Sequence, residues 1–164
     1  MTAVIGIDPG LSGAIALLRS NGELLLEDMP ILDVAKKVID EHQLASILDR
    51  LGSVEPGTVV YLERVGVRPG EGPVGAFTFG RGYGLIRGVC IANFLRIEDV
   101  TPAAWKKAQG VKGEKDVSRE RASQLLPRHA HLWPRKKDHG RAEAALIAVH
   151  GTQQERTREH LLAA

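Results

Sequence analysis

The sequence is poor in cysteine and has no long apolar segment. Its single cysteine, Cys90, excludes an internal disulfide and lies in an apolar stretch, where we expect a small buried core residue. No apolar run approaches the roughly 18 to 20 residues that a membrane helix needs, and the N-terminus lacks the pattern of a signal peptide. These absences favour a soluble, cytoplasmic protein with no membrane partner.

The length and composition are those of one globular domain. The chain has 164 residues, of which 43% are hydrophobic and 26% charged, and this balance argues against disorder. The sequence shows no internal repeat, low-complexity tract or domain linker. We therefore expect a single domain over residues 1–164, with a C-terminal tail from about residue 151.

Positive charge is concentrated in one segment. The net charge is only +2, but residues 101–141 carry 11 lysines and arginines against 4 acidic residues, whereas residues 1–100 carry 9 against 13. A basic segment of this density can supply contacts to nucleic-acid phosphates. Charge alone fits a solvated surface equally well, so its interpretation depends on the rest of the sequence.

Short apolar runs and turn residues predict an α/β fold. Runs at residues 3–8, 13–18 and 23–26 predict a three-stranded antiparallel meander, and two further strands are predicted at 58–62 and 95–100. Helices are predicted from residue 44 to 52, over 77–94, from Pro102 through Lys107, over 117–126 and from about 138 through 148. The order βββαβαβα predicts a mixed five-stranded sheet with helices on both faces, which is the RNase H-like order.

Three acidic residues stand where an acid is energetically unfavourable. Asp8 ends the first predicted strand, Glu63 follows the fourth, and Glu143 interrupts the apolar pattern of the last helix. If those two strands are neighbours and the helix packs beside them, the three carboxylates meet, with Asp138 and His139 near the same face. Each acid also has a simpler explanation: Asp8 can cap the turn at residues 8–10, Glu63 can pair with a lysine, and Glu143 can face solvent.

Clustered carboxylates predict a divalent metal site. A cation relieves their mutual repulsion, and oxygen ligands favour Mg²⁺ or Mn²⁺ over zinc. Two such ions, about 3.5–4 Å apart, would hold an attacking water and stabilise the leaving oxygen of a phosphodiester. The sequence shows neither a Ser/His/Asp or Cys/His nucleophile set nor a zinc-ligand spacing. Metal-dependent phosphodiester hydrolysis is therefore the predicted chemistry.

Five segments resemble, in the same order, segments of RuvC-type Holliday junction resolvases. They read GIDPG at 6–10, YLE at 61–63, FGRGYG at 79–84, TPAAWKK at 101–107 and KKDHGRAEA at 136–144. The last three are similar to the phage and poxvirus-like branch of this family within the RNase H-like superfamily. The resemblance extends from residue 4 to about residue 150.

The resemblance implies a homodimeric, structure-selective endodeoxyribonuclease that resolves four-way (Holliday) junctions by paired nicks with Mg²⁺ or Mn²⁺. If the gene belongs to a phage, the protein would act in the host cytoplasm. Catalytic and metal-binding roles are carried onto Asp8, Glu63 and Glu143. Bacterial RuvC proteins place a further acid or histidine three residues before the last acid, where this chain has Gly140. We assign the fourth catalytic and metal-binding position to Asp138, with His139 as the alternative.

The resemblance also implies that basic residues of this chain contact the DNA. Lys106, Lys107 and Lys115 are similar to family lysines near the scissile phosphate, where a lysine can stabilise transition-state charge or bind a backbone phosphate. We expect Lys107 and Lys115 to act in catalysis. The residues expected to bind DNA are Lys106, Lys112, Arg135, Lys136, Lys137 and Arg81. Trp105 is expected to anchor a short helix in the core. Gly80, Gly84 and Gly88 lie along one helix face, which can pack on the sheet or form a two-fold dimer contact.

Other functions fit part of this pattern. An actin-like kinase shares the GID opening but needs a second lobe, for which 164 residues leave no room. An RNase H-like nuclease acting on RNA or on other branched DNA would share the acids without needing a junction-spanning dimer. A non-catalytic branched-DNA-binding protein is expected to have lost one of the acids, and all three are present.

Overall fold

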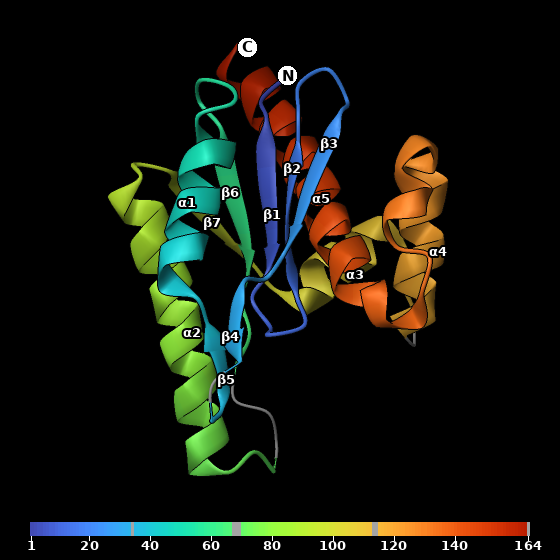
Figure 1. The fold of residues 1–164 in the computed structure, drawn as a ribbon. Coiled ribbons are helices and arrows are strands. Elements are labelled where there is room, and N and C mark those ends of the chain that lie inside the picture. The colour runs from blue at the N-terminus through green and yellow to red at the C-terminus, as the bar shows by residue number, and fades with distance from the viewer. Residues whose placement is uncertain (34, 67–69, 113–114, 164) are drawn as a thin grey trace.

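The computed structural model describes residues 1–33, 35–66, 70–112 and 115–163, and its centre is a five-stranded sheet (Figure 1). The strands are β1 (Val4–Asp8), β2 (Ala14–Leu18), β3 (Leu24–Asp28), β6 (Val59–Glu63) and β7 (Arg96–Val100). Their spatial order is β3-β2-β1-β6-β7. The first three form an antiparallel meander, and β6 and β7 run parallel to β1. The predicted mixed sheet is confirmed.

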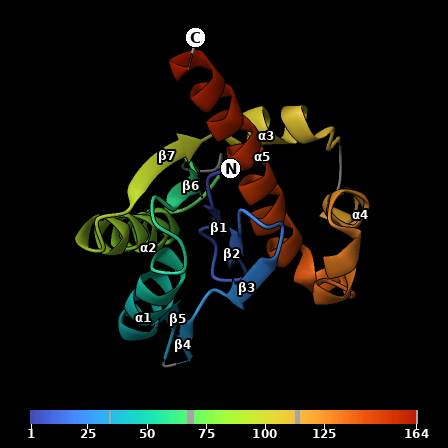
Figure 2. The same cartoon turned by 90° about the horizontal axis from the view of Figure 1, so that it is seen from above.

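Helices cover both faces of the sheet, as predicted. Helices α1 (Glu41–Gly52) and α2 (Pro73–Ala92) lie on one face, and α5 (His139–Leu162) crosses the other (Figure 2). Beside α5 pack α3 (Pro102–Gln109) and α4 (Lys115–Leu125). The N-cap and Pro102 start predicted for α3 are confirmed, because the Thr101 side chain accepts a hydrogen bond from the backbone N of Ala104.

Alternation along the strands separates two cores and decides which face receives the acids. Ile5 and Ile7 of β1 pack with Leu62 of β6 against α1 and α2. The intervening residues of β1 and β6 face α5, because successive side chains point to opposite faces of a sheet. This parity directs Asp8 and Glu63 toward α5.

A glycine in β1 permits unusually close packing of α5. A Cβ atom on Gly6 would lie 2.3 Å from the backbone oxygen of Ala144 and 2.4 Å from the backbone nitrogen of Ala148. Only glycine fits here, since the atoms that a Cβ would meet belong to the backbone of α5 and cannot move aside as a flexible side chain can. The helix backbone therefore lies directly on the strand that ends in Asp8, which brings Glu143 to the same end of the sheet.

Several boundaries differ from the predictions. A two-stranded hairpin, β4 (Ile31–Asp33) and β5 (Lys37–Ile39), was not predicted, because three-residue strands carry too little alternation to detect. Helix α2 begins at Pro73, and the segment 127–137 contains two 3-10 helices, η1 (Pro127–Leu132) and η2 (Lys136–Asp138), in place of a plain loop.

Helix α5 also extends beyond its predicted end near residue 148, into the segment expected to be a tail. It continues to Leu162 because Thr152 and Glu155 remain buried there, and Glu155 accepts a hydrogen bond from the Tyr61 hydroxyl at 2.9 Å. Cys90 is buried, as expected. Among the described residues, no helix has both the length and the apolar character needed to cross a bilayer.

Candidate active site

Asp8 lies at the carboxyl end of β1, half-buried beside the first turn of α5. Its Oδ1 accepts a hydrogen bond from the backbone N of Gly10 at 3.2 Å, so the turn-capping role is real. The pKa of Asp8 is raised to about 6, chiefly by burial and in part by the charge of Glu143. The Gly10 hydrogen bond and the charges of His139 and Lys106 oppose this increase. Asp8 therefore caps the turn and also interacts electrostatically with Lys106 of α3 and with His139 and Glu143 of α5.

Glu63 ends the neighbouring parallel strand and is only 8% exposed. The register pairs Ile7 with Leu62, so the next residues along, Asp8 and Glu63, leave the sheet side by side. The Glu63 Oε1 accepts a hydrogen bond from Trp105 Nε1 at 2.7 Å. The pKa of Glu63 is raised to about 7, chiefly by burial and in part by the charges of Asp8 and Glu143, whereas the Trp105 hydrogen bond lowers it.

Glu143 reaches the same place from α5. Its side chain is 14% exposed, so the solvent-facing alternative is wrong. Its Oε1 accepts a hydrogen bond from Ser118 Oγ at 3.1 Å and lies 3.6 Å from Lys106 Nζ. Elements distant in the sequence, α3, α4 and α5, therefore position this carboxylate together.

The three carboxylates form one electrostatic cluster at the carboxyl edge of the parallel strands. Glu143 raises the pKa of both Asp8 and Glu63, and Asp8 raises that of Glu63. Among the described residues, no three His, Cys, Asp or Glu side chains meet at a common ligand distance. Each carboxylate instead bonds a protein donor: the Gly10 amide, the Trp105 indole or the Ser118 hydroxyl. Carboxylates that raise one another's pKa repel each other when ionised, and a hard divalent cation, which prefers oxygen ligands, would relieve that repulsion.

Asp138 does not join this cluster. Both of its oxygens bond Arg135: Oδ2 accepts from the backbone N at 2.9 Å and from Nε at 3.0 Å, and Oδ1 accepts from Nη2 at 2.9 Å. This pairing lowers the pKa of Asp138 to about 2. His139, the next residue, is among the charges that act on Asp8. The pairing of Asp138 with Arg135 and the electrostatic effect of His139 on Asp8 therefore favour the alternative, His139, over Asp138 as the fourth group.

The absence of a carboxylate three residues before Glu143 has a steric reason. A Cβ atom on Gly140 would lie 2.2 Å from the backbone oxygen of Ser12 and 3.2 Å from Asp8 Oδ2. Any side chain at this position would push the start of α5 away from the β1–β2 turn. A fourth ligand must therefore come from a neighbouring position on the helix.

Among the described side chains, Lys106 lies beside the carboxylates; it was expected to bind DNA and to resemble a family lysine near the scissile phosphate. It approaches Glu143 and also lies 5.2 Å above the Trp105 ring, while its charge acts on Asp8 and Glu63. Lys107, predicted to be catalytic, is exposed on α3 and makes no contact with the three acids. The side chain of Lys115 lies outside the described residues.

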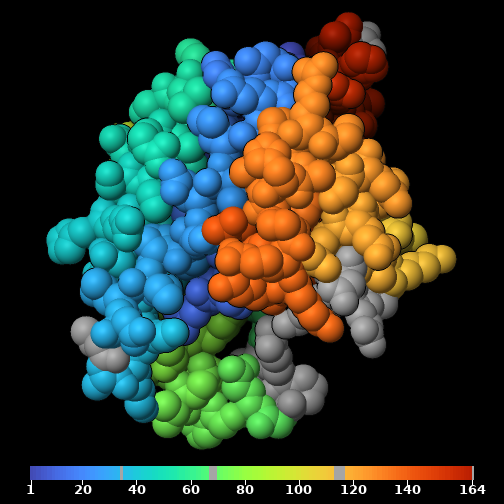
Figure 3. Space-filling view, turned by 45° about the vertical axis from the view of Figure 1, so that its right-hand side comes forward, coloured from blue at the N-terminus to red at the C-terminus, as the bar shows by residue number. Residues whose placement is uncertain are grey.

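The other predicted DNA-binding residues are dispersed over the surface. Lys112, Lys136 and Lys137 are exposed, and the last two directly precede α5. Arg81 is exposed on α2, away from the carboxylates, and lines a separate cavity. Arg135 is held by Asp138. The described part of the basic segment 101–141, coloured yellow to orange, forms one side of the molecule (Figure 3).

Sequence reasoning missed two residues that hold the acids. Trp105 was expected in the core and is fully buried, but its hydrogen bond to Glu63 was not anticipated. Ser118 was not singled out, and no local pattern marks it, because its partner Glu143 lies 25 residues away.

Solved structures with the same arrangement of elements include RuvC from Thermus thermophilus. It aligns with a TM-score of 0.60 and 16% identity over 94% of this chain and 97% of that chain. The same protein in complex with Holliday junction substrate aligns with a TM-score of 0.59 and 15% identity, covering 90% and 92%. The yeast mitochondrial Holliday junction resolvase Ydc2 aligns with a TM-score of 0.50 and 16% identity, covering 90% of this chain and 76% of that chain.

These similarities are found through structure alone. No protein-family model matches the sequence, and no curated protein matches it. At 15–16% identity, the alignments bear on the backbone arrangement and not on individual side chains. The chain therefore has the RNase H-like fold in the form found in RuvC-type Holliday junction resolvases.

Proposed function

We propose that this protein is a metal-dependent endodeoxyribonuclease that resolves four-way DNA junctions by paired phosphodiester hydrolysis. The observation that carries the proposal is the electrostatic cluster of Asp8, Glu63 and Glu143 at the carboxyl edge of β1 and β6. Strongly perturbed pKa values on groups that share charge partners cluster at functional sites. The likeness to RuvC and Ydc2 supplies the substrate class.

Asp8, Glu63 and Glu143, with His139 as the fourth group, would hold Mg²⁺ or Mn²⁺, as a pair of ions. When bound, such ions supply an activated water and neutralise charge on the phosphate that is cut. The donor set fits, because carboxylate oxygens with one imidazole suit these metals better than a thiolate site would. For Asp138 to serve as the fourth ligand in place of His139, its hydrogen bonds to Arg135 would have to break.

The protein's own groups then have distinct tasks. Trp105 fixes the orientation of Glu63 through a buried hydrogen bond, and Ser118 does the same for Glu143. The ammonium group of Lys106 lies beside Glu143 and acts electrostatically on Glu63, so it can bind a phosphate oxygen there and stabilise its charge. Exposed lysines of the basic segment supply further phosphate contacts, so binding weakens as salt rises.

We also propose that the active form is a homodimer joined through α2. The positions of Gly80, Gly84 and Gly88 have nothing within 4 Å of an added Cβ, so this face does not pack on the sheet. Phe77 and Ile91 extend the same face and are 73% and 61% exposed. Figure 2 shows α2 at the edge of the molecule. An exposed apolar stripe with glycines every fourth residue suits close packing against the same helix of a second copy.

A cleavage assay tests the proposal. A synthetic immobile four-way junction and a linear duplex would each be incubated with Mg²⁺, Mn²⁺ or chelator, using the unmodified protein, Asp8→Asn and Glu143→Gln. We expect paired nicks confined to the junction and abolished by chelator and by either substitution. Tight junction binding without cleavage under either metal would instead indicate a structural DNA-binding protein. Cleavage that ignores branching, or cleavage of RNA, would overturn the junction-specific function.

A further inference from the structure

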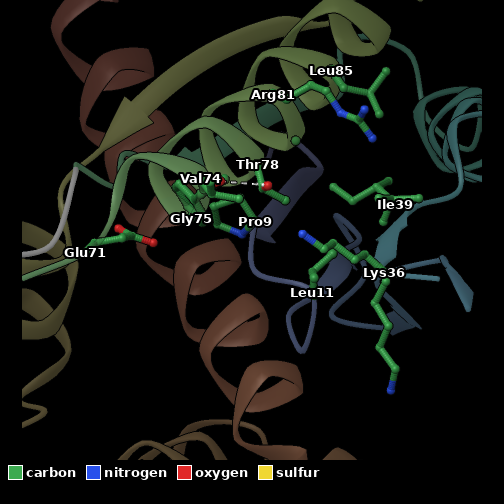
Figure 4. A pocket seen from close by; sticks show the side chains of 14 residues that line it. Pro9, Leu11, Lys36, Ile39, Glu71, Val74, Gly75, Thr78, Arg81 and Leu85 are labelled. Carbon is green, nitrogen blue, oxygen red and sulfur yellow. Dashed lines mark hydrogen bonds between the residues drawn. The ribbon is translucent and has the colours of Figure 1, made fainter. Parts of the chain in front are cut away.

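A cavity of about 340 Å³ lies between the β4–β5 hairpin and the N-terminal half of α2 (Figure 4). Its third wall is Pro9 and Leu11, in the loop that directly follows Asp8. The proposed nuclease function leaves this cavity without a role. Its size is at the lower end of that of small-molecule sites, roughly 300–1,000 Å³.

The floor of the cavity is apolar and well packed. Ile39 of the hairpin is 5% exposed, and Pro9 is also buried. A Cβ atom on Gly82 would lie 3.2 Å from Ile39 Cδ1, so α2 rests directly on the hairpin. Phe79 and Leu85 complete the apolar lining from the helix. Such a surface suits the flat face of a planar ring.

The rim is cationic. Lys36 and Lys37 come from the hairpin and Arg81 from α2. Lys37 lies 3.9 Å from Asp33, whereas Lys36 and Arg81 have no ion-pair or hydrogen-bond partner within the described part of the chain. Glu71 is the acidic residue of the lining, and Figure 4 shows it on the side opposite Arg81 and Lys36. One side of the cavity therefore presents unpaired positive charge.

A second hollow extends the cavity toward the loops that follow Asp8 and Glu63. It shares Leu11, Lys37, Glu71 and Phe79 with the first, and it reaches Ser12 and Gly66. Ser12 follows Asp8 in the β1–β2 turn, and Gly66 follows Glu63 in the chain. A groove thus runs from the loops after both catalytic strands to the hairpin.

We propose that this cavity binds one unstacked nucleotide of the DNA strand that is cut. The base would lie against Phe79 and Pro9, and its phosphate would be bound by Arg81 and Lys36. An aromatic and apolar floor with a cationic rim is how proteins bind single-stranded nucleic acid, since every base has a flat face and every nucleotide a negative charge. The inference rests on the proposed nuclease function, because the groove leads to the cavity from the loops that follow Asp8 and Glu63.

Photo-crosslinking tests the inference directly. A short single-stranded oligonucleotide and a four-way junction, each carrying 5-iododeoxyuridine, would be bound to the full-length protein with Ca²⁺ in place of Mg²⁺ and irradiated. Crosslinked residues would be located by peptide mass spectrometry. We expect crosslinks to Phe79 in the cavity and not to Phe94, which follows the end of α2, does not line the cavity and is 97% exposed. The oligonucleotide arm needs no junction-cutting activity.

Binding measurements with charge variants provide a second readout. Arg81→Ala and Lys36→Ala should each weaken binding of the oligonucleotide about 3- to 10-fold and reduce the steepness of its salt dependence. Arg156→Ala is the matched control, because it removes an exposed arginine near Met1, and it should change affinity by less than about 1.5-fold.

The outcomes separate the two proposals. Crosslinks to Phe79 without junction cutting would sink the nuclease function and support the cavity. Paired junction cutting with crosslinks on Phe94, or elsewhere outside the cavity lining, would overturn the cavity inference and leave the nuclease function standing. Bound oligonucleotide that gives no crosslink to Phe79, together with unchanged affinity in Arg81→Ala and Lys36→Ala, would also overturn it.

Discussion

The indole Nε1 of Trp105 donates a hydrogen bond to Oε1 of Glu63 at 2.7 Å, and both side chains are buried. The same ring lies 5.2 Å beneath the ammonium group of Lys106. One tryptophan on α3 therefore sets the position of a carboxylate on β6 and supports the lysine beside Glu143.

Trp105→Phe keeps most of the ring and removes the donor. We expect the free energy of unfolding to fall by about 1–3 kcal/mol, because a buried hydrogen bond to an acid is lost. The pKa of Glu63 should rise further, since the indole N–H lowers it. The acid limb of the pH–rate profile for junction cleavage should then move to higher pH.

Trp133→Phe is the matched control for that experiment. Trp133 is 2% exposed, and its Nε1 donates a hydrogen bond to Ser123 Oγ at 2.9 Å, away from the acids. It should lose stability to a similar extent without any change in the pH profile. Identical profiles for both variants would show that Trp105 has only a packing role.

The metal-free protein should become less stable as pH rises from about 4 to about 7. Folding raises the pKa of Asp8 to about 6 and that of Glu63 to about 7. The folded state therefore binds more protons than the unfolded state across this window, and the free energy of unfolding falls as those protons are released. Asp8→Asn should weaken this dependence and stabilise the metal-free protein by about 1–3 kcal/mol at pH 8.

Unfolding in urea between pH 4 and pH 8, with chelator, measures this effect. Added Mg²⁺ or Mn²⁺ should raise the melting temperature of the unmodified protein at pH 8 and have little effect on Asp8→Asn. A metal-free stability that is flat with pH in both proteins would contradict the electrostatic cluster.

Substitutions of Asp138 and of His139 show which of the two residues acts as the fourth metal-binding group. His139→Ala should lower the rate of junction cleavage by at least about 10-fold and raise the Mn²⁺ concentration needed for half-maximal activity. Asp138→Asn should retain the metal dependence. It should instead remove a stabilisation of about 1 kcal/mol, after allowance for the exposure of Arg135, that is present above about pH 4 and lost as pH falls toward 2. A larger catalytic loss in Asp138→Asn would reverse this assignment.

Lys106 is expected to matter more than its neighbour Lys107. Lys106→Ala should lower the cleavage rate about 10- to 100-fold, because it removes the cation 3.6 Å from Glu143. Lys107→Ala removes the same charge from an exposed position and should cost less than about 3-fold. Single-turnover cleavage at saturating protein separates these rates from DNA affinity. Equal losses would assign both lysines to general phosphate binding.

Gly84→Arg tests the proposed dimer. The side chain would project from the exposed stripe on α2, where an added Cβ meets nothing within 4 Å. We expect a folded monomer by analytical ultracentrifugation, with the helix itself favoured by up to about 1 kcal/mol. Junction nicks should become unpaired. Gln154→Arg places the same charge on the exposed part of α5 and should remain dimeric. An unchanged oligomeric state in Gly84→Arg would place the interface elsewhere.

The order of the elements and the three principal acids follow from local sequence patterns. Alternating apolar residues identify β1 and β6, and the Thr101-Pro102 pair marks the start of α3. An acid at the end of a buried strand is conspicuous because its neighbours are apolar. These features depend on a few consecutive residues, so the sequence reveals them without knowledge of the packing.

Only the tertiary structure decides between adjacent residues. Lys106 and Lys107 are neighbours on α3 and point in directions about 100° apart. Asp138 ends η2 and His139 begins α5, so these two neighbours belong to different helices. Which of each pair meets Asp8 or Glu143 depends on how the helix docks, and the docking of α5 is fixed by Gly6 and Gly140 pressing against backbone atoms. The sequence alone determined that carboxylates gather at one end of the sheet. The packing of α3, α4 and α5 decided which side chains accompany them, because those partners come from segments far apart in the chain.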